Sequence, residues 1–220
     1  MSASVFPVIL SSPSGGGKTT ICKELLAIRP DVGYSVSATT RLPRAAEVDG
    51  RDYHFLSQGE FQSRRERGEF AEWAEVHGKL YGTLRREVSR VLESGRHVIM
   101  DIDVQGARQF VQSFPESVLI FLLPPSTDVL LTRLQERKTE NRLDLVVRLQ
   151  TARRELTSLE LYHYVVVNDS LRKAVHDVSA VIDAESVRRT RNPALADQIE
   201  ELVSGLDREI GLLEQGVEAN

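Results

Sequence analysis

The chain has 220 residues, of which 41% are hydrophobic, and a formal net charge of −4. This hydrophobic content is sufficient for a folded core, and the interspersed acids and bases argue against binding nucleic acid through overall charge. The single cysteine, Cys22, excludes an internal disulfide framework. No apolar run approaches membrane-spanning length and the N-terminus has no signal-like apolar core, so we expect a cytoplasmic protein without a membrane partner.

A glycine-rich segment at residues 12–19 has the sequence SPSGGGKT. It follows the apolar run 5–10 and precedes residues 20–29, whose apolar positions recur at helical spacing. The local order is therefore strand, glycine loop and helix. Consecutive glycines allow positive φ, so several N–H groups can turn toward an anion at the start of the helix.

This loop predicts a site for a triphosphate. Lys18 is expected on the β and γ phosphates, and the Thr19 hydroxyl on the Mg2+ that accompanies them. Ser12 stands where the Walker A motif usually has its first glycine. The alternative is a flexible glycine turn with a solvated lysine. The residues predicted to bind the triphosphate, which the family resemblance described below implies is ATP, are Ser12, Pro13, Ser14, Gly15, Gly16, Gly17, Lys18 and Thr19.

The next part of the chain predicts a small mixed lobe, at about residues 35–83, inserted into the core. Residues 31–40 alternate in polarity and predict one short strand, and residues 39–55 are polar and rich in arginine, which predicts a binding loop. Ser57 and Glu60 form a capping box that opens a short helix. Residues 70–76 predict a half-buried strand.

Strands and helices then alternate, which predicts an α/β fold with a mostly parallel, doubly wound sheet. Asp101 and Asp103 stand at the carboxyl end of a predicted strand, where such sheets bind ligands. The predicted strands are 97–102, 117–123 and 164–167, and the predicted helices are 84–94, about 104–111, one from 126, about 143–161 and about 171–189.

Asn192 and Pro193 mark a boundary, and residues 191–220 predict a helical extension with one apolar face. We favour packing of this face on its own domain. Contact with a second copy, giving a homo-oligomer, is the alternative. The apolar positions are Ile199, Leu202, Val203, Leu206, Ile210 and Leu213.

Seven motifs occur in order between residues 6 and 184: SPSGGGKT, SVSATTRLPRAAEVDGRDYHF, FAEWAEV, YGT, MDIDVQGA, FLLPPS and VVVND. In this order they closely resemble the guanylate kinase family. The resemblance implies a P-loop kinase core at residues 1–34 and 84–190, a GMP-binding lobe and a lid at about 135–148. It also implies transfer of the γ-phosphoryl group of MgATP to GMP and dGMP.

The resemblance implies that Arg41, Arg44, Tyr53 and Tyr81 hold the GMP phosphate. Arginine offers a planar, bidentate grip on phosphate, and a phenol hydroxyl adds a neutral donor. Without the surrounding motif, two arginines three residues apart would indicate a solvated loop.

Glu72 matches the family residue that recognises guanine. One carboxylate can accept from both the N1–H and the 2-amino group of guanine, whereas adenine offers neither donor there and presents an acceptor instead. Ser37 and Thr83 match the hydroxyls that complete base recognition, and we expect Asp103 to join them. An exposed glutamate on an alternating strand is the alternative for Glu72.

Lys18, Arg133, Arg137 and Arg148 are the implied catalytic residues, the arginines closing from the lid over the triphosphate. Ordinary helix-surface arginines are the alternative. The family lid has a glycine-containing turn, whereas residues 135–141 here are QERKTEN. We expect this segment to be mobile and to become ordered when ligands bind.

Two further residues are implied at the ATP side. Asn168 matches a residue beside the adenine, and Asp101 would hold Mg2+ through water. Two rival functions stay open: an inactive peptide-binding module, which usually lacks a working phosphate loop, and a kinase for another nucleoside monophosphate, which Glu72 disfavours.

Overall fold

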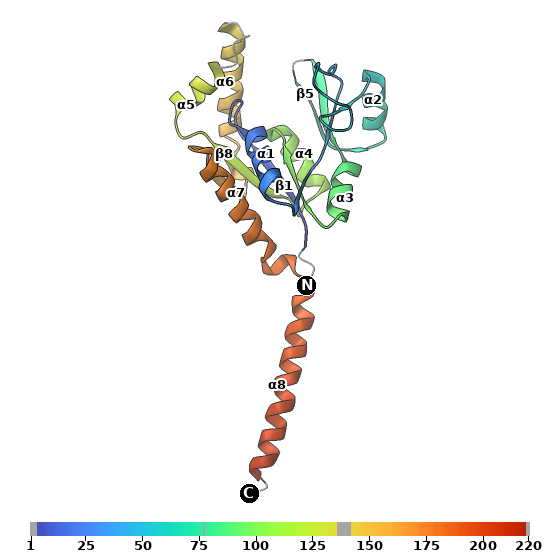
Figure 1. The fold of residues 1–220 in the computed structure, drawn as a ribbon, viewed down its shortest axis with the longest axis vertical. Coiled ribbons are helices and arrows are strands. Elements are labelled where there is room, and N and C mark those ends of the chain that lie inside the picture. The colour runs from blue at the N-terminus through green and yellow to red at the C-terminus, as the bar shows by residue number, and fades with distance from the viewer. Residues whose placement is uncertain (1–3, 77, 136–141, 219–220) are drawn as a thin grey trace. The chain divides into compact units, whose positions relative to one another are not determined.

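A parallel sheet is the central layer of the computed structural model, which describes residues 4–76, 78–135 and 142–218 (Figure 1). Its strands stand in the order β2-β7-β1-β8-β9, and every neighbouring pair is parallel. The predicted α/β fold with a parallel sheet is therefore confirmed. The strands are β1 (Pro7–Ser11), β2 (Val32–Tyr34), β7 (His97–Asp101), β8 (Val118–Leu123) and β9 (Tyr164–Val167).

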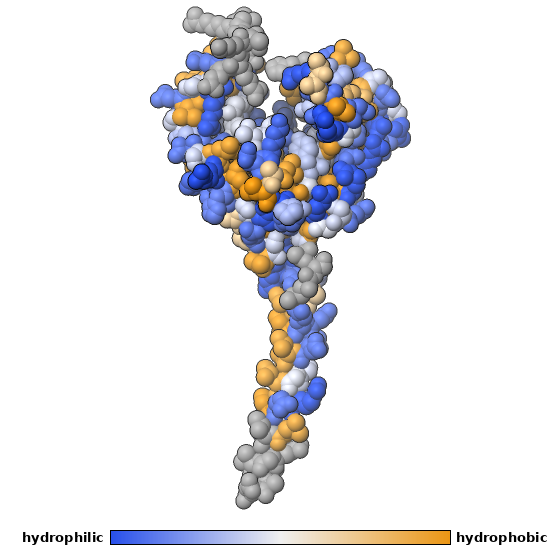
Figure 2. Space-filling view, viewed as in Figure 1, coloured by the Kyte–Doolittle hydropathy of each residue, from blue (hydrophilic) through white to orange (hydrophobic). Residues whose placement is uncertain are grey.

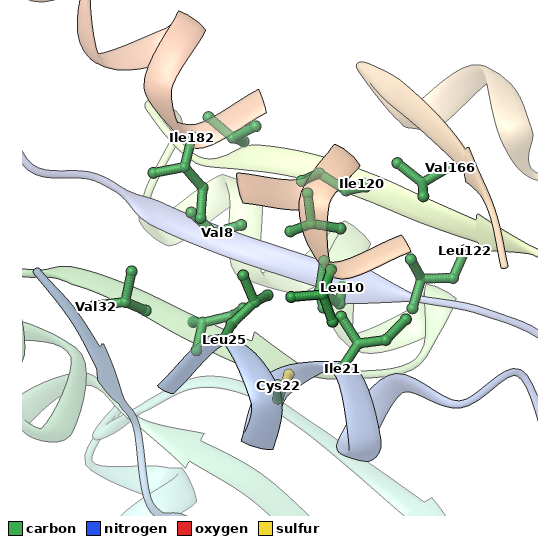
Figure 3. Close-up of a cluster of buried hydrophobic side chains, with 14 of the residues drawn as sticks. Val8, Leu10, Ile21, Cys22, Leu25, Val32, Ile120, Leu122, Val166 and Ile182 are labelled. Carbon is green, nitrogen blue, oxygen red and sulfur yellow. The ribbon is translucent and has the colours of Figure 1, made fainter. Parts of the chain in front are cut away.

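Helices cover both faces of this sheet because its strands are apolar on both sides. Val8 and Leu10 point to one face and pack with Ile21 and Leu25 (Figure 3), whereas Ile9 points to the other. The first face is covered by α1 (Lys18–Ile28) and α7 (Leu171–Ser186), and the second by α3 (Arg85–Glu93) and α4 (Val104–Ser113).

A second sheet, with strand order β4-β3-β6-β5, forms the inserted lobe. The prediction of one strand over 31–40 is wrong, because the chain passes from the central sheet to the second sheet between Tyr34 and Ser37. Alternating polarity reports burial, and burial continues across this crossing at Ser35 and Val36. The strands are β3 (Ser37–Thr39), β4 (His54–Phe55), β5 (Phe70–Val76) and β6 (Lys79–Leu84).

The lobe has its own small core beside α2 (Gln58–Glu66). The predicted capping box is present, since the Ser57 side chain accepts from the Glu60 N–H and the Glu60 carboxylate accepts from the Ser57 N–H at 2.8 Å. Phe61 of this helix stacks on Phe70 of β5 with ring centroids 4.3 Å apart.

Two helices flank the predicted lid, α5 (Thr127–Gln135) and α6 (Arg142–Leu156). They pack together through Leu130, Leu134 and Ala152. The helix predicted over 143–161 ends early, and a 3-10 turn, η1 (Leu159–Leu161), follows it. Arg137 and the rest of residues 136–141 lie outside the described residues.

Contacts divide the chain into one unit of Val5–Ile182 and another that contains Asp183–Asn220. The helix predicted to reach residue 189 ends at Ser186, and buried Glu185 then accepts from Arg191 at 2.8 Å, before η2 (Arg189–Arg191) leads to α8 (Leu195–Glu218). None of the helices in the described ranges is long and apolar enough to cross a membrane.

An apolar stripe runs along α8 (Figure 2). Its large side chains are between 50% and 68% exposed, and the side chain of Leu213 lies outside the described part. What this face packs against, its own domain or a second copy, stays a prediction. The exposed residues of the predicted face are Ile199, Leu202, Val203, Leu206 and Ile210.

Candidate active site

A cleft of about 500 Å3 lies within the first unit, where the carboxyl ends of β1 and β7 meet the second sheet and α6. It brings together side chains that are far apart in the sequence. The described residues that line it do not include Arg41, Arg44, Thr83, Arg133 or Asn168. The predicted site residues that line the cleft are Ser14, Lys18, Ser37, Tyr53, Glu72, Tyr81, Asp101, Asp103 and Arg148.

The glycine loop depends on its three glycines for two different reasons. Gly15 and Gly17 have φ of 80° and 87°, a conformation that other residues rarely adopt, and Gly17 caps α1. Gly16 instead leaves room for a neighbour, because a Cβ there would lie 2.2 Å from Ser12 Oγ. The bare Gly16 therefore makes the loop compatible with Ser12 in place of the usual first glycine.

Ser12 also fixes the position of the loop lysine. Lys18 Nζ donates to the Ser12 carbonyl at 3.0 Å and to Ser12 Oγ at 3.3 Å. Burial lowers the pKa of Lys18, and the carboxylates of Glu155, Asp101 and Asp103 oppose that shift. The ammonium group is thus held at the loop, facing the cleft.

Asn168 and Arg133 support the phosphate loop through a chain of two hydrogen bonds. Asn168 is buried and donates from Nδ2 to the Gly16 carbonyl at 2.8 Å. Arg133 Nη2 donates to the Asn168 carbonyl at 3.0 Å, while Arg133 Nη1 is buried with no hydrogen-bond partner among the described residues. The structure places Asn168 against the phosphate loop itself.

Arg148 is docked on the phosphate loop from α6. Its Nε and Nη2 both donate to Ser14 Oγ, at 3.3 and 3.1 Å, and its Nη1 donates to the Leu134 carbonyl at 3.3 Å. Only 7% of this arginine is exposed. The guanidinium is therefore positioned beside the loop rather than extended into solvent.

The two predicted Mg2+ residues touch each other. Thr19 Oγ1 donates to Asp101 Oδ2 at 2.6 Å, and Tyr34 OH donates to the other carboxylate oxygen at 2.8 Å. Within the described ranges no group of three or more His, Cys, Asp or Glu is arranged to hold a metal ion. A hydroxyl and a carboxylate nevertheless fit Mg2+, which takes few protein ligands when substrate phosphates supply the others. Sequence reasoning missed Tyr34, whose only signal is its place at a strand's carboxyl end.

Glu72 is a buried carboxylate that lines the same cleft as Lys18, with 6% exposure. Its Oε1 accepts from Thr83 Oγ1 at 2.7 Å, and Thr83 pairs in register with Ser37. Burial raises the pKa of Glu72 to about 7, and the nearby Asp103 adds to the rise. The helix α4 begins here, since Asp103 caps it by accepting from the Gly106 N–H at 2.7 Å.

Arg41 is held by an acid that sequence reasoning missed. Both Arg41 Nη atoms donate to the Glu47 carboxylate at 2.8 Å, and this pairing lowers the pKa of Glu47 to about 2. The Arg41 guanidinium also lies 5.2 Å from the centroid of the Tyr53 ring. Tyr53 and Tyr81 meet edge to face, whereas the Arg44 side chain is exposed. The pair spans six residues of an irregular loop, where no periodic pattern predicts contacts.

The guanylate kinase family model matches residues 4–185, a range that contains every residue of this cleft. The chain belongs to the guanylate kinase family. The resemblance seen in the sequence motifs is therefore confirmed. The family match ends before α8 begins, so that helix lies outside the matched range.

Relatives in this family are similar over most of their length. The guanylate kinase of Caldanaerobacter subterraneus subsp. tengcongensis is 44% identical over 88% of this chain and 94% of its own. That of Desulfitobacterium hafniense is 47% identical over 84% and 93%. The crystal structure of guanylate kinase from Anaplasma phagocytophilum is similar with a TM-score of 0.74 and 32% identity, covering 91% of this chain and 96% of that one.

Proposed function

We propose that this chain transfers the γ-phosphoryl group of ATP to GMP, and to dGMP, giving ADP and the nucleoside diphosphate. The observation that carries this proposal is that Lys18 and Glu72 line one cleft. A phosphate-loop cation and a buried acceptor for guanine N–H groups are thereby available to two nucleotides at once.

The donor side supplies positive charge and backbone donors. Phosphoryl transfer through a loose transition state requires positioning and charge neutralisation more than a strong base. Lys18 binds the β and γ phosphates, and Arg133, Arg137 and Arg148 add charge to the transferring group. Asn168 contributes to ATP binding by holding the Gly16 carbonyl. Thr19, and Asp101 through water, would hold Mg2+, which neutralises phosphate charge when bound.

The acceptor side of the cleft binds both the phosphate and the base of GMP. Arg41 and Arg44 bind its phosphate with help from Tyr53 and Tyr81, and this phosphate needs no general base because its second pKa is about 6. Glu72 accepts from guanine. The base contacts are completed by Ser37, Thr83 and Asp103.

A coupled assay of ADP release tests this proposal with GMP, dGMP, AMP, UMP and CMP as acceptors. We expect rapid release only with GMP and dGMP. Equal rates with AMP and GMP would exclude Glu72 as the residue that recognises guanine. Absence of release with every acceptor would favour an inactive module, a reading opposed by the arrangement of Lys18, Gly15 and Gly17.

A further inference from the structure

A β-bulge lies directly before Glu72. In the pairing of β5 with β6, Phe70 lies opposite Leu84 and Glu72 lies opposite Thr83, so two steps along β5 match one step along β6. The extra residue is Ala71. Bulges of this kind change the direction of the side chains that follow them and often occur beside functional sites.

The bulge changes which way Glu72 points. In a regular strand Phe70 and Glu72 would share one face. Instead Phe70 and Trp73, three residues apart, both pack in the small core of the lobe, and Arg65 of α2 lies 4.5 Å from the Trp73 ring centroid. Ala71 packs with the core of the central sheet. Glu72 is therefore turned away from the core of the lobe and toward the cleft.

Helix α4 holds the backbone on both sides of Glu72. The side-chain amide of Gln109 donates to the Trp73 carbonyl at 2.9 Å and accepts from the Trp73 N–H at 3.2 Å. Ser113 Oγ donates to the Ala71 carbonyl at 3.1 Å. Since β5 is the edge strand of its sheet, these side chains take the place of a missing neighbouring strand.

The same helix approaches the carboxylate itself. A Cβ at Gly106 would lie 2.7 Å from Glu72 Oε2, so only glycine leaves room for the carboxylate in this position. Residues 106, 109 and 113 of α4 thus contact three successive residues of β5. The carboxylate is aligned by the core of the protein as well as by its own lobe.

We propose that Gln109 and Ser113 are positioning residues for guanine specificity: they hold the bulged segment of β5 so that Glu72 points at the base. This inference rests on the proposed function, because it acts through the contact of Glu72 with guanine. If α4 were only a structural support, loss of its contacts would instead change the turnover of all acceptors alike.

The test compares Gln109→Ala with wild type, using GMP and IMP as acceptors. IMP keeps the N1–H of guanine and lacks the 2-amino group. The ratio of kcat/KM for GMP to kcat/KM for IMP therefore measures the contact of Glu72 with the 2-amino group. Gln109→Ala removes the two hydrogen bonds to the Trp73 backbone, so we expect the ratio to fall about tenfold while KM for ATP stays unchanged. Gln112→Ala is the matched control, since Gln112 is exposed on the same helix.

Other outcomes overturn the inference in distinguishable ways. The positioning role alone is rejected if Gln109→Ala lowers kcat/KM equally for GMP and IMP, or lowers neither, while Glu72→Gln in the same assay lowers the ratio of GMP to IMP. An unchanged ratio in Glu72→Gln would reject the guanine contact and the positioning role together. Should Gln109→Ala fail to fold, Ser113→Ala removes one hydroxyl contact at the same bulge, and we expect the same change of ratio to a smaller extent.

Discussion

The donor and acceptor ends of the cleft are built differently. The donor end consists mainly of eight consecutive residues whose shape depends on three neighbouring glycines. The acceptor end combines side chains from three strands and one loop, which strand pairing and α4 bring together. A local motif therefore determines one half of the site, and long-range packing determines the other.

The two ends also differ in how their charges are held. Lys18 and Arg148 donate to neutral oxygens of Ser12 and Ser14, and Lys18 also lies near the carboxylates of Glu155, Asp101 and Asp103. Arg41 instead pairs with Glu47, and Glu72 is a carboxylate that burial makes hard to ionise. On the proposed function, an arriving acceptor must share Arg41 with Glu47 and favour the ionised form of Glu72, whereas ATP meets Lys18 and Arg148 at the phosphate loop.

The largest expected effect is at the donor end, in Lys18→Ala. Loss of this cation should lower kcat by about 10²–10³-fold or more, as when one preorganised donor is removed. The melting temperature should change little, because the hydrogen bonds of Lys18 within the described part of the chain go to Ser12 of its own loop. Steady-state kinetics and a thermal melt measure both, with exposed Lys23→Ala on the same helix as control. Near-normal turnover would refute the role of the phosphate loop.

The next effect concerns the acceptor end and depends on pH. Burial raises the pKa of Glu72 from its ordinary value of 4.5 to about 7. Between these two values the folded protein keeps a proton that the unfolded chain has released, so the folded state loses stability as pH rises through this window. Above pH 7 the cost is complete, at about 3 kcal/mol.

Glu72→Gln removes this cost. We expect the variant to exceed wild type in free energy of unfolding by about 3 kcal/mol at pH 8 and to match it below about pH 4.5. Urea unfolding at several pH values measures the difference, and Glu75→Gln, at an exposed position of the same strand, is the control. A pH-independent difference would mean that folding does not shift the pKa of Glu72. GMP affinity should rise with pH up to about 7 more steeply for the wild type than for the variant, in which only the GMP phosphate, with a second pKa of about 6, still ionises.

The smallest effect tests whether the loop is a local structure. Gly16→Ala places a Cβ 2.2 Å from Ser12 Oγ and should destabilise the protein by about 1–3 kcal/mol through overpacking, while raising KM for ATP. The double variant Ser12→Gly with Gly16→Ala should recover part of the lost stability, because it removes the Ser12 side chain but leaves the Pro13 carbonyl 2.9 Å from the added Cβ. Denaturant unfolding and ATP kinetics provide the measurement. If the double variant is no better than the single one, the clash lies elsewhere.

Sequence reasoning succeeded where chemistry is local. The glycine loop, the capping box at Ser57 and the alternation of strands and helices each arise from residues within a few positions of one another, and the structure contains all three. The family resemblance then predicted residues of the acceptor end by their motifs, and these roles stay predictions. It did not require knowledge of how they are held.

Sequence reasoning failed where contacts connect distant segments. The pairing of Tyr34 with Asp101 spans 67 residues, and that of Gln109 with Trp73 spans 36. The bulge at Ala71 was hidden for another reason: its register shift is a property of two strands, and one strand's pattern of polarity cannot define it. The helix ends at Leu156 and Ser186 were missed because apolar periodicity continued beyond the last hydrogen-bonded turn.

The central position of β1 has a consequence for how the chain acquires its activity during synthesis. Pro7 pairs with Val98 and Val8 pairs with Val118, so both neighbours of the first strand are made about 90 to 110 residues later. At about 5–20 residues per second, the ribosome needs roughly 5 to 20 s to supply them. Until then the nascent phosphate loop has an unpaired strand on its N-terminal side. Such long-range parallel pairing is slow to form and exposes apolar strand edges, so early release of the chain would yield an aggregation-prone fragment rather than a partly active kinase.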